Sequence, residues 1–192
     1  MAYPTDVLAA GDLVTAAQIN RWCVLLADTT LASAAASVDL TSIPAHWTNL
    51  MLVVYGRGDF GAVGVTGCLR FNNDSAGNYD QEILRGNNAT ASALNALAST
   101  SISIGSFPGA SGTANYFGMC AVLIPNYANA VGQKASIAWG AARFTSAATD
   151  MYNDIVGGFW RSTAAINRVT VFPNSGNFEV GTRVSLYGMG RI

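Results

Sequence analysis

The sequence predicts an all-β protein: an antiparallel β-sandwich, jelly-roll-like, preceded by an N-terminal extended arm and one short helix. Three observations predict this fold class. Beyond residue 30, apolar and polar residues alternate with a period of two, which is typical of half-buried strands. Segments rich in Gly, Asn, Ser and Ala separate these runs and favour turns. Before residue 30, apolar residues recur at helical spacing. We therefore divide the 192 residues into an arm and helix, 1–30, and a β-sandwich domain, 31–192.

The first 30 residues are expected to attach the domain to something else. Residues 1–13 contain a proline and a glycine and read as an extended arm. A Thr-x-x-Gln capping box then opens a helix. A helix of about 12 residues is marginal by itself, so its apolar face needs a partner, either the sandwich or a neighbouring subunit. The residues of this face, which fall at i, i+3, i+4 and i+7, are predicted to serve attachment to sister subunits or to a larger assembly: Ile19, Trp22, Cys23 and Leu26.

Ten segments after this helix carry strand patterns. They are 31–40, 48–55, 65–72, 79–85, 100–107, 115–124, 133–144, 152–160, 165–172 and 182–188. The last two flank a cluster of turn residues, and this predicts a β-hairpin that closes the sheet. The stretch 86–99 has no clear period, and it is consistent with a short helix or a surface loop.

The composition predicts a protein that buries its surface in an assembly. Charged residues make up 11% of the chain, against about 25% in typical soluble domains. Hydrophobic residues make up 51%, yet no run approaches the roughly 18 residues of a membrane-spanning helix, so no membrane insertion is expected. We therefore expect apolar faces to be buried against copies of the same chain or a larger assembly. The alternative is an Ala-rich monomer with ordinary apolar exposure.

The charge and the cysteine spacing limit which partners, metal sites and disulfides are expected. The net charge is −1, Lys134 is the single lysine, and no basic patch is visible, so a nucleic-acid partner is not expected. Cys23, Cys68 and Cys120 are widely spaced, which fits neither a zinc site nor a disulfide framework. We expect three buried thiols in a reducing cytoplasm. The first residues lack the pattern of a secretion signal.

No catalytic residue and no cofactor is predicted. The single histidine, His46, stands between an alanine and a tryptophan before a strand, and no G-x-S-x-G nucleophile motif is present. Carboxylate pairs for glycan hydrolysis exist only as candidates. Asp80 and Glu82 share one strand face, and Asp150 and Asp154 flank the start of another strand.

Binding motifs are equally sparse. The oxygen-rich stretch FNNDSAGNYD, 71–80, is better explained by a turn than by a calcium site, so no metal ligand is assigned. The G-x-G-x-x-G string at 56–61 is not followed by a helix, and the Arg-Gly-Asp within it is too short to indicate a binding motif. Aromatic residues beside Asn and Gly suit either a glycan surface or a core. The candidates for a ligand surface are Tyr79, Tyr127 and Tyr152.

Three stretches resemble one family. They are WRSTAAINRVTVFPNSGNFEVGTRVSLYG at 160–188, LRFNNDSAGNYD at 69–80, and the pair ANYFG at 114–118 and IPNYA at 124–128. In order and spacing, across roughly residues 38–189, they resemble a family of small structural proteins of tailed bacteriophages. The motifs are common to tail-tip, fibre and head-surface components of that family.

The resemblance implies a non-enzymatic virion structural protein, made in the host cytoplasm and exposed on the virion surface. It would be a capsid decoration protein or head fibre, or a minor tail or tail fibre component. Its partners would be itself, as a homo-oligomer and most simply a homotrimer, and the major capsid or tail proteins. One alternative is a tail-tip adhesin that binds a host surface glycan. A weaker alternative is a glycan depolymerase.

Overall fold

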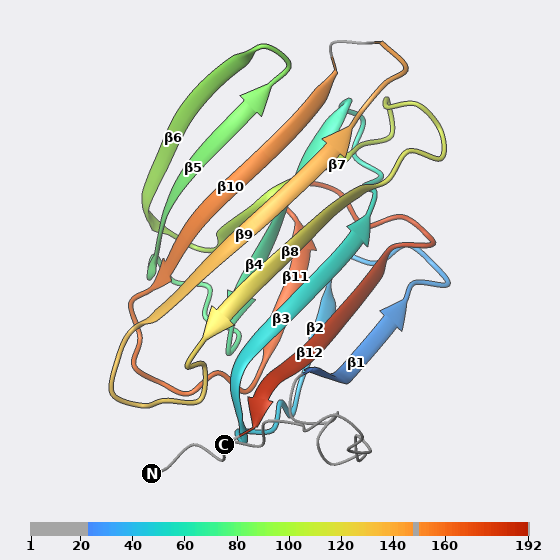
Figure 1. Ribbon diagram of the computed structural model, residues 1–192. Coiled ribbons are helices and arrows are strands. Elements are labelled where there is room, and N and C mark those ends of the chain that lie inside the picture. Colours follow the sequence, from blue (N-terminus) through green and yellow to red (C-terminus); the bar gives the residue numbers. More distant parts are fainter. Residues whose placement is uncertain (1–22, 148–149, 192) are drawn as a thin grey trace, which may run out of the picture.

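Two antiparallel sheets face one another in a sandwich-like arrangement (Figure 1). This computed structural model describes residues 23–147 and 150–191, and all secondary structure in that part of the chain is β. The strands, in chain order, are β1 (Cys23–Thr30), β2 (Val38–Leu40), β3 (Trp47–Gly56), β4 (Gly64–Phe71), β5 (Tyr79–Asn87), β6 (Thr90–Ser99), β7 (Ile102–Pro108), β8 (Gly118–Pro125), β9 (Lys134–Arg143), β10 (Met151–Trp160), β11 (Val169–Pro173) and β12 (Arg183–Arg191).

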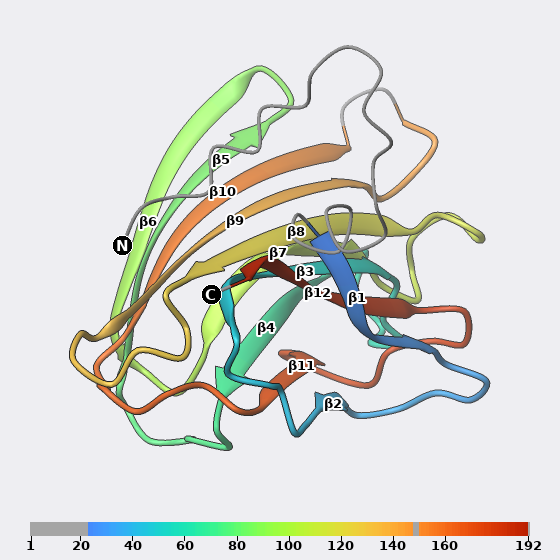
Figure 2. The ribbon, with the colours of Figure 1, turned by 60° about the horizontal axis from the view of Figure 1, so that its bottom comes forward.

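The two sheets differ in width. The larger has eight strands in the order β1-β12-β3-β8-β9-β10-β5-β6, and the smaller has four in the order β2-β11-β4-β7 (Figure 2). The chain crosses from one sheet to the other at most connections and stays within the large sheet only from β5 to β6 and from β8 through β10. Strand β7 packs over β8, β9 and β10, so the hairpin β5–β6 extends past the edge of the small sheet.

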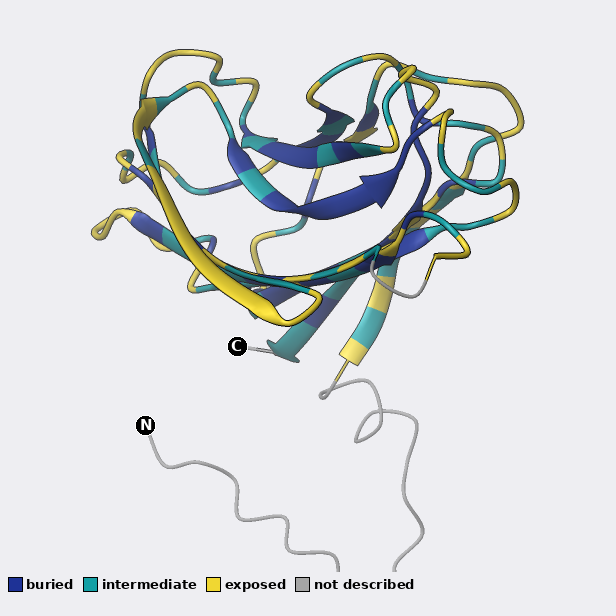
Figure 3. Cartoon of the chain, turned by 90° about the horizontal axis from the view of Figure 1, so that it is seen from above, coloured by how far each residue is buried: buried dark blue, intermediate teal, exposed yellow. Residues whose placement is uncertain are grey.

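The core lies between the sheets, where Figure 3 shows the buried residues gathered. Each central strand of the large sheet points alternate residues inward, as a pleated strand must. In β3, Leu50, Leu52 and Val54 are fully buried. Strands of the small sheet supply the opposing layer, including Phe71 and Val171. Removing these apolar side chains from water is the main force holding the two layers together.

The predicted short helix is not present in the described residues. Cys23 to Thr30 form β1, the edge strand of the large sheet, which pairs with β12. A β-bulge between Leu25 and Ala27 breaks the period of two within β1, which weakens the strand signal of this segment. Ile19 and Trp22, the first half of the predicted face, lie outside the described residues. The assignment of 1–30 to attachment stays a prediction.

Two further elements differ from the sequence prediction. The last two strands do not form a hairpin: β11 belongs to the small sheet and β12 to the large one. The loop between them crosses the end of the sandwich, where buried Phe178 forms bridges to Ala35 and Gly58. The ambiguous stretch 86–99 contains the tip of the hairpin β5–β6 and the whole of β6, so it is a strand and neither a helix nor a loop.

Candidate functional site

The outer face of the eight-stranded sheet is the strongest candidate for a functional surface. We call outer face the side of this sheet that is turned away from the four-stranded sheet. Its central residues stand in one row across neighbouring strands, since Leu84 is opposite Ile155, Ile155 opposite Trp139, and Trp139 opposite Ala121. Directly opposite side chains lie about 5 Å apart and touch, so the row is continuous. Leu84, Ile155 and Trp139 are 55%, 45% and 41% exposed.

A second row runs beside the first. Ile137 is opposite Leu123, Leu123 opposite Met51, Met51 opposite Tyr187, and Tyr187 opposite Leu25 on β1. From β10 to β1 this apolar surface spans six strands, which is about 24 Å at the ~4.8 Å spacing of strands. Leu25 is 50% exposed and the other four residues of this row are half-buried, so water reaches the row along its length. Contiguous apolar patches in contact with water mark interaction surfaces on soluble domains.

The aromatic part of the outer face is held in a fixed position. Tyr55, half exposed, stacks on Phe117 with ring centroids 4.8 Å apart and planes 10° apart. Phe117 comes from the segment just before β8, and Tyr55 stands opposite Met119, which is also exposed. A stacked aromatic pair of this kind contributes about 1 kcal/mol beyond its buried area, so these rings form a rigid part of the surface.

Charges on the outer face lie at its margins, and Arg183 and Asp28 there form an ion pair. Arg183 donates to both carboxylate oxygens of Asp28 at 2.8 Å, and the Ser185 hydroxyl donates to the same group at 2.7 Å. The hydrogen bonds from Arg183 and then Ser185 lower the pKa of Asp28 to about 2, so it is ionised at neutral pH. Glu82 stands at the β5 margin and Arg143 at the end of β9. The centre of the outer face therefore carries no charge among the described residues.

A shallow depression marks the β5 side of the outer face. Its lining comes from β5, β6 and β10, with Leu84, Ala93 and Ile155 on the outer side and Arg85 and Asn153 at its end. It is open and mostly apolar. This shape suits a bulky apolar side chain from a partner better than a small polar ligand, which needs a deeper site with converging polar groups.

Behind this face, an ion pair on the inner side of the large sheet is hydrogen-bonded to Ser106 of the small sheet. Arg85 donates to both carboxylate oxygens of Asp154, at 2.6 and 3.1 Å, and to the hydroxyl of Ser106 at 3.0 Å. Ser106 completes the triangle by donating to Asp154 at 2.9 Å. The guanidinium also lies over the Tyr152 ring, 4.7 Å from its centroid. These polar groups form hydrogen bonds with one another. The cluster therefore fixes the positions of β5 and β10 and leaves no free donor or acceptor pointing at a ligand.

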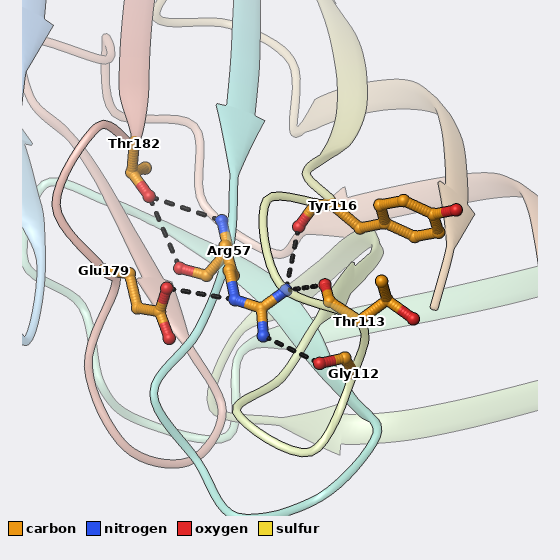
Figure 4. Close-up of polar contacts among 6 residues, drawn as sticks. All are labelled: Arg57, Gly112, Thr113, Tyr116, Glu179 and Thr182. Carbon is orange, nitrogen blue, oxygen red and sulfur yellow. Dashed lines mark hydrogen bonds and ion pairs between the residues drawn. The ribbon is translucent and has the colours of Figure 1, made fainter. Parts of the chain in front are cut away.

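At one end of the sandwich, Arg57 holds three loops together (Figure 4). The side chain is buried, and its Nε lies 3.0 Å from the Glu179 carboxylate. Its two terminal nitrogens donate to backbone carbonyls of the loop between β7 and β8: Gly112 at 3.1 Å, Thr113 at 2.7 Å and Tyr116 at 3.1 Å. The Arg-Gly-Asp string is therefore structural, since Asp59 is likewise occupied by the backbone and side-chain nitrogens of Asn177.

The structure removes two of the three predicted ligand tyrosines from the surface. Tyr79 and Tyr127 are fully buried. Tyr79 stacks on Trp160 and donates to the Phe71 carbonyl, and burial raises its pKa to about 12. Tyr127 donates to the Pro44 carbonyl.

Tyr152, the third predicted ligand tyrosine, is half-buried. It packs edge-on against Phe144, with ring centroids 4.8 Å apart, beneath Arg85. The aromatic rings exposed on the large sheet are others, namely Tyr55, Trp139 and Phe159.

The remaining candidates are dispersed. Asp154 is buried between the sheets, whereas Asp80 on β5 is paired with Arg161, so these carboxylates do not face each other across a cleft. In the 71–80 stretch, Asp74 accepts hydrogen bonds from Ala76, Asn78 and Trp160. This is the turn that the sequence favours over a calcium site, and within the described residues no cluster of metal-ligating side chains occurs. No helix in the described part of the chain could cross a membrane.

The cysteines are split. Cys68 and Cys120 are buried as expected, and burial raises the pKa of both thiols, that of Cys68 to about 11. Cys23 is exposed, so the expectation of three buried thiols was wrong there. The side chain lies on the outer side of β1, where Cys23 stands opposite Met189. Leu26, the other described member of the predicted attachment face, packs against the core from the bulge of β1.

Sequence reasoning missed the outer face, although a signal for it exists. Several strands are apolar at successive positions, as in LMLVVY (50–55) and MCAVLI (119–124). A strand with one wet face alternates apolar and polar residues, and a continuous apolar run indicates a strand buried on both faces. In these strands one parity fills the core, and the other parity covers the outer face. The sequence pattern of these strands is thus typical of a sheet with apolar residues on both faces.

Comparisons with known proteins add little. No protein-family model matches the chain, and no curated protein sequence matches it. Among solved structures, the exo-inulinase from Aspergillus awamori aligns with 9% identity and a TM-score of 0.44, covering 87% of this chain, which spans 29% of that enzyme. Eiger TNF from S. frugiperda aligns with 10% identity and a TM-score of 0.22, covering 90% of this chain and 96% of that one. At such TM-scores the likenesses carry no argument about activity.

Proposed function

We propose that this chain is a non-enzymatic structural protein of a tailed-phage virion, exposed on the particle as a capsid decoration, head-fibre or minor tail component. In this proposal it assembles as a homo-oligomer, and the family resemblance favours a trimer. The observation that carries the proposal is the apolar outer face, which is too wide and too free of charge to face water. The occupants that we assign to it are the outer faces of neighbouring copies, which pack together around the axis of the trimer.

The topology supports the proposal, because we infer a jelly roll. With β1, β2, β3, β4, β7, β8, β11 and β12 lettered B to I in chain order, the small sheet reads C-H-E-F and the first half of the large sheet reads B-I-D-G. This is the strand order of a two-sheet jelly roll, a fold that viral capsid and lectin domains use. The hairpins β5–β6 and β9–β10 are then insertions that widen the large sheet.

The chemistry of the outer face favours a second copy over a charged partner. The centre of the face offers no charge, so two identical faces meet without like-charge repulsion, whereas a charged partner would lose its hydration without compensation. Aromatic and methionine side chains, such as Trp139, Tyr55 and Met51, are the types that interface centres prefer. Contact through a single apolar face is also the simplest way to hide the surplus apolar surface of a chain with 11% charged residues.

Native mass spectrometry of the full chain tests the assembly. Trp139→Asp places a charge at the centre of the outer face, 41% exposed in the subunit, and should break the outer-face contact and lower the mass of the assembly without unfolding the subunits. Val131→Asp is the matched control, because Val131 lies in the loop between β8 and β9 and is 86% exposed. A wild-type monomer, or a Trp139→Asp variant of unchanged mass and fold, would overturn the proposed interface.

The virion role needs a second measurement. Quantitative mass spectrometry of purified particles made from the encoding genome should detect the chain at a fixed ratio to the major capsid protein. A high copy number supports decoration of the head, and a few copies per particle support a tail position. Absence from the particles would overturn the virion assignment and leave the oligomer to be judged on its own.

A further inference from the structure

Sheet edges need protection, and three of the four edges in this fold have it. An edge strand presents a row of unpaired backbone N–H and C=O groups, which natural proteins shield with bulges, charges, prolines, short strands or covering groups. The edge strand β1 has a bulge after Leu25, and its Asp28 is ionised and bound to Arg183. The edge strand β2 has only three residues.

The edge strand β7 is also shielded. Its register shifts relative to β4 between Gly67 and Cys68, so Ile104 is an extra residue, and the strand ends at Pro108. The side-chain oxygen of Gln81, from β5 above it, accepts the backbone N–H of Ser103 at 2.6 Å.

Among the residues that the structure describes, strand β6 has none of these devices over most of its length. Residues 90–96 run in regular register with β5, and the shift that ends this register comes only after Ala96. Thr90–Ser99 contains no charged residue, no proline and no glycine. Within the described chain β6 pairs with β5 alone, and the backbone N–H of Ala98 also donates to the carboxylate of Asp80 on β5. Its residues are exposed almost throughout, including Leu94 and Leu97.

We propose that β6 pairs edge to edge with β6 of a second copy, antiparallel about a two-fold axis, so that two large sheets become one. A second strand satisfies a whole row of alternating backbone donors and acceptors at once, which is the basis of recognition by strand addition. An uncharged strand is compatible with itself, because no like charges meet across the axis. Closed homo-oligomers are most often built on two-fold contacts between identical surfaces.

This inference rests on the homo-oligomer of the proposed function, and it concerns a separate contact. The outer face lies on the broad side of the sheet, whereas the β6 contact lies in the plane of the sheet. A three-fold assembly through the outer face, joined in pairs through β6, gives a closed hexamer with D3 symmetry. Every complete assembly then contains an even number of chains.

Native mass spectrometry of an edge-charged variant tests the proposal. In Ala91→Lys/Asn95→Lys, the new lysines stand opposite Gly86 and Glu82 of the same chain, so the hairpin tolerates them. Across the two-fold axis they bring four cations together. The assembly mass should fall to half that of the wild type. Val131→Lys/Ala110→Lys adds the same charge in exposed loops and should keep the full mass.

A disulfide scan gives an independent readout. In a Cys23→Ser background, Ala91→Cys, Ala93→Cys and Asn95→Cys are oxidised in turn, and at least one should give a covalent dimer in most of the protein. Val131→Cys should give none. Backbone amides of residues 90–96 should also exchange with deuterium at least ten times faster in the edge-charged variant than in the wild type.

The outcomes separate the two proposals. An odd number of subunits, an unchanged mass in the edge-charged variant, or no cross-link in the scan would overturn the β6 contact and leave the outer-face oligomer standing. The assembly mass could be halved in the edge-charged variant and unchanged in Trp139→Asp. This result would support the edge contact and overturn the outer-face interface. A wild-type monomer at every concentration would overturn both.

Discussion

Arg85 on β5 and Asp154 on β10 form a two-pronged ion pair on the inner side of the large sheet, with Nε 2.6 Å from one carboxylate oxygen and a terminal nitrogen 3.1 Å from the other. Asp154 is almost fully buried, and Arg85 is 20% exposed. Asp154→Ala leaves a guanidinium without its partner in a poorly hydrated place, and breaking a buried pair in this way costs about 3–5 kcal/mol. Urea unfolding should show this loss as a lower midpoint with an unchanged slope.

Two variants define what the ion pair contributes. Arg85→Met/Asp154→Leu removes both charges at similar volume and should recover most of the lost stability, because the pair's attraction roughly offsets its desolvation. Arg161→Ala breaks the more exposed pair with Asp80 and should cost less than about 1 kcal/mol. Equal losses in Asp154→Ala and Arg161→Ala would contradict the difference in burial on which this prediction depends.

Gly188 allows the Trp47 indole to lie flat against β12. A Cβ at position 188 would lie 2.5 Å from carbons of the ring, closer than side-chain contacts allow. Gly188→Ala should therefore displace the buried ring and lower the free energy of unfolding by about 1–3 kcal/mol. Gly157→Ala on β10 is the control, since nothing lies within 4 Å of its Cβ position, and its stability should be unchanged or slightly higher.

The low pKa of Asp28 predicts a specific acid sensitivity. In the folded chain, hydrogen bonds from Arg183 and Ser185 lower this pKa from 3.8 to about 2. A carboxylate whose pKa is lower when folded contributes stability above its unfolded pKa and loses it as the pH falls through the folded value. The contribution should thus disappear between about pH 4 and pH 2, and Asp28→Asn should remove that part of the pH dependence. Thermal unfolding of both proteins across this range measures it, and parallel curves would refute the prediction.

The three thiols should react in two classes. Cys23 is exposed, whereas Cys68 and Cys120 are buried with raised pKa values, so they are protonated and shielded at neutral pH. A thiol reagent at pH 8 should label one cysteine quickly in the native chain and all three in denaturant. Cys23→Ser should abolish the fast phase. Rapid native labelling of Cys68 or Cys120 would mean that the sandwich opens more readily than its packing indicates.

The strands of the sandwich were predictable where one face is core and the chain alternates. The segments around Leu50, Val122 and Val169 were placed close to their observed bounds. β6 was missed because its residues are exposed on both sides, so apolar and polar residues do not alternate along it. β1 was mistaken for a helix, and its bulge weakens the strand signal of that segment. Pairing was less predictable than the strands: β11 and β12 are consecutive, yet their neighbours come from distant parts of the chain.

The candidate site was harder to predict than the fold. Buried and exposed tyrosines have similar sequence neighbours in this chain, so the sequence could not distinguish buried Tyr79 and Tyr127 from exposed Tyr55. Which parity of a doubly apolar strand faces the core depends on the second sheet, and that is a tertiary property. The low charge content did indicate excess apolar surface, but it could not locate that surface on one side of one sheet.

Arg57 should control the order of the loop between β7 and β8. Arg57→Ala leaves three carbonyl oxygens of residues 112–116 without their donor, in a partly buried place where unsatisfied groups cost about 1–3 kcal/mol each. Amides of this loop should exchange with deuterium faster, while the central strands β3 and β8 keep their protection. Glu179→Gln is the matched variant: Glu179 is 34% exposed, and the amide oxygen can still accept from Nε, so loss of order should be small. If Glu179→Gln loosened the loop as much as Arg57→Ala, the ion pair would be the main restraint and the carbonyl bonds secondary.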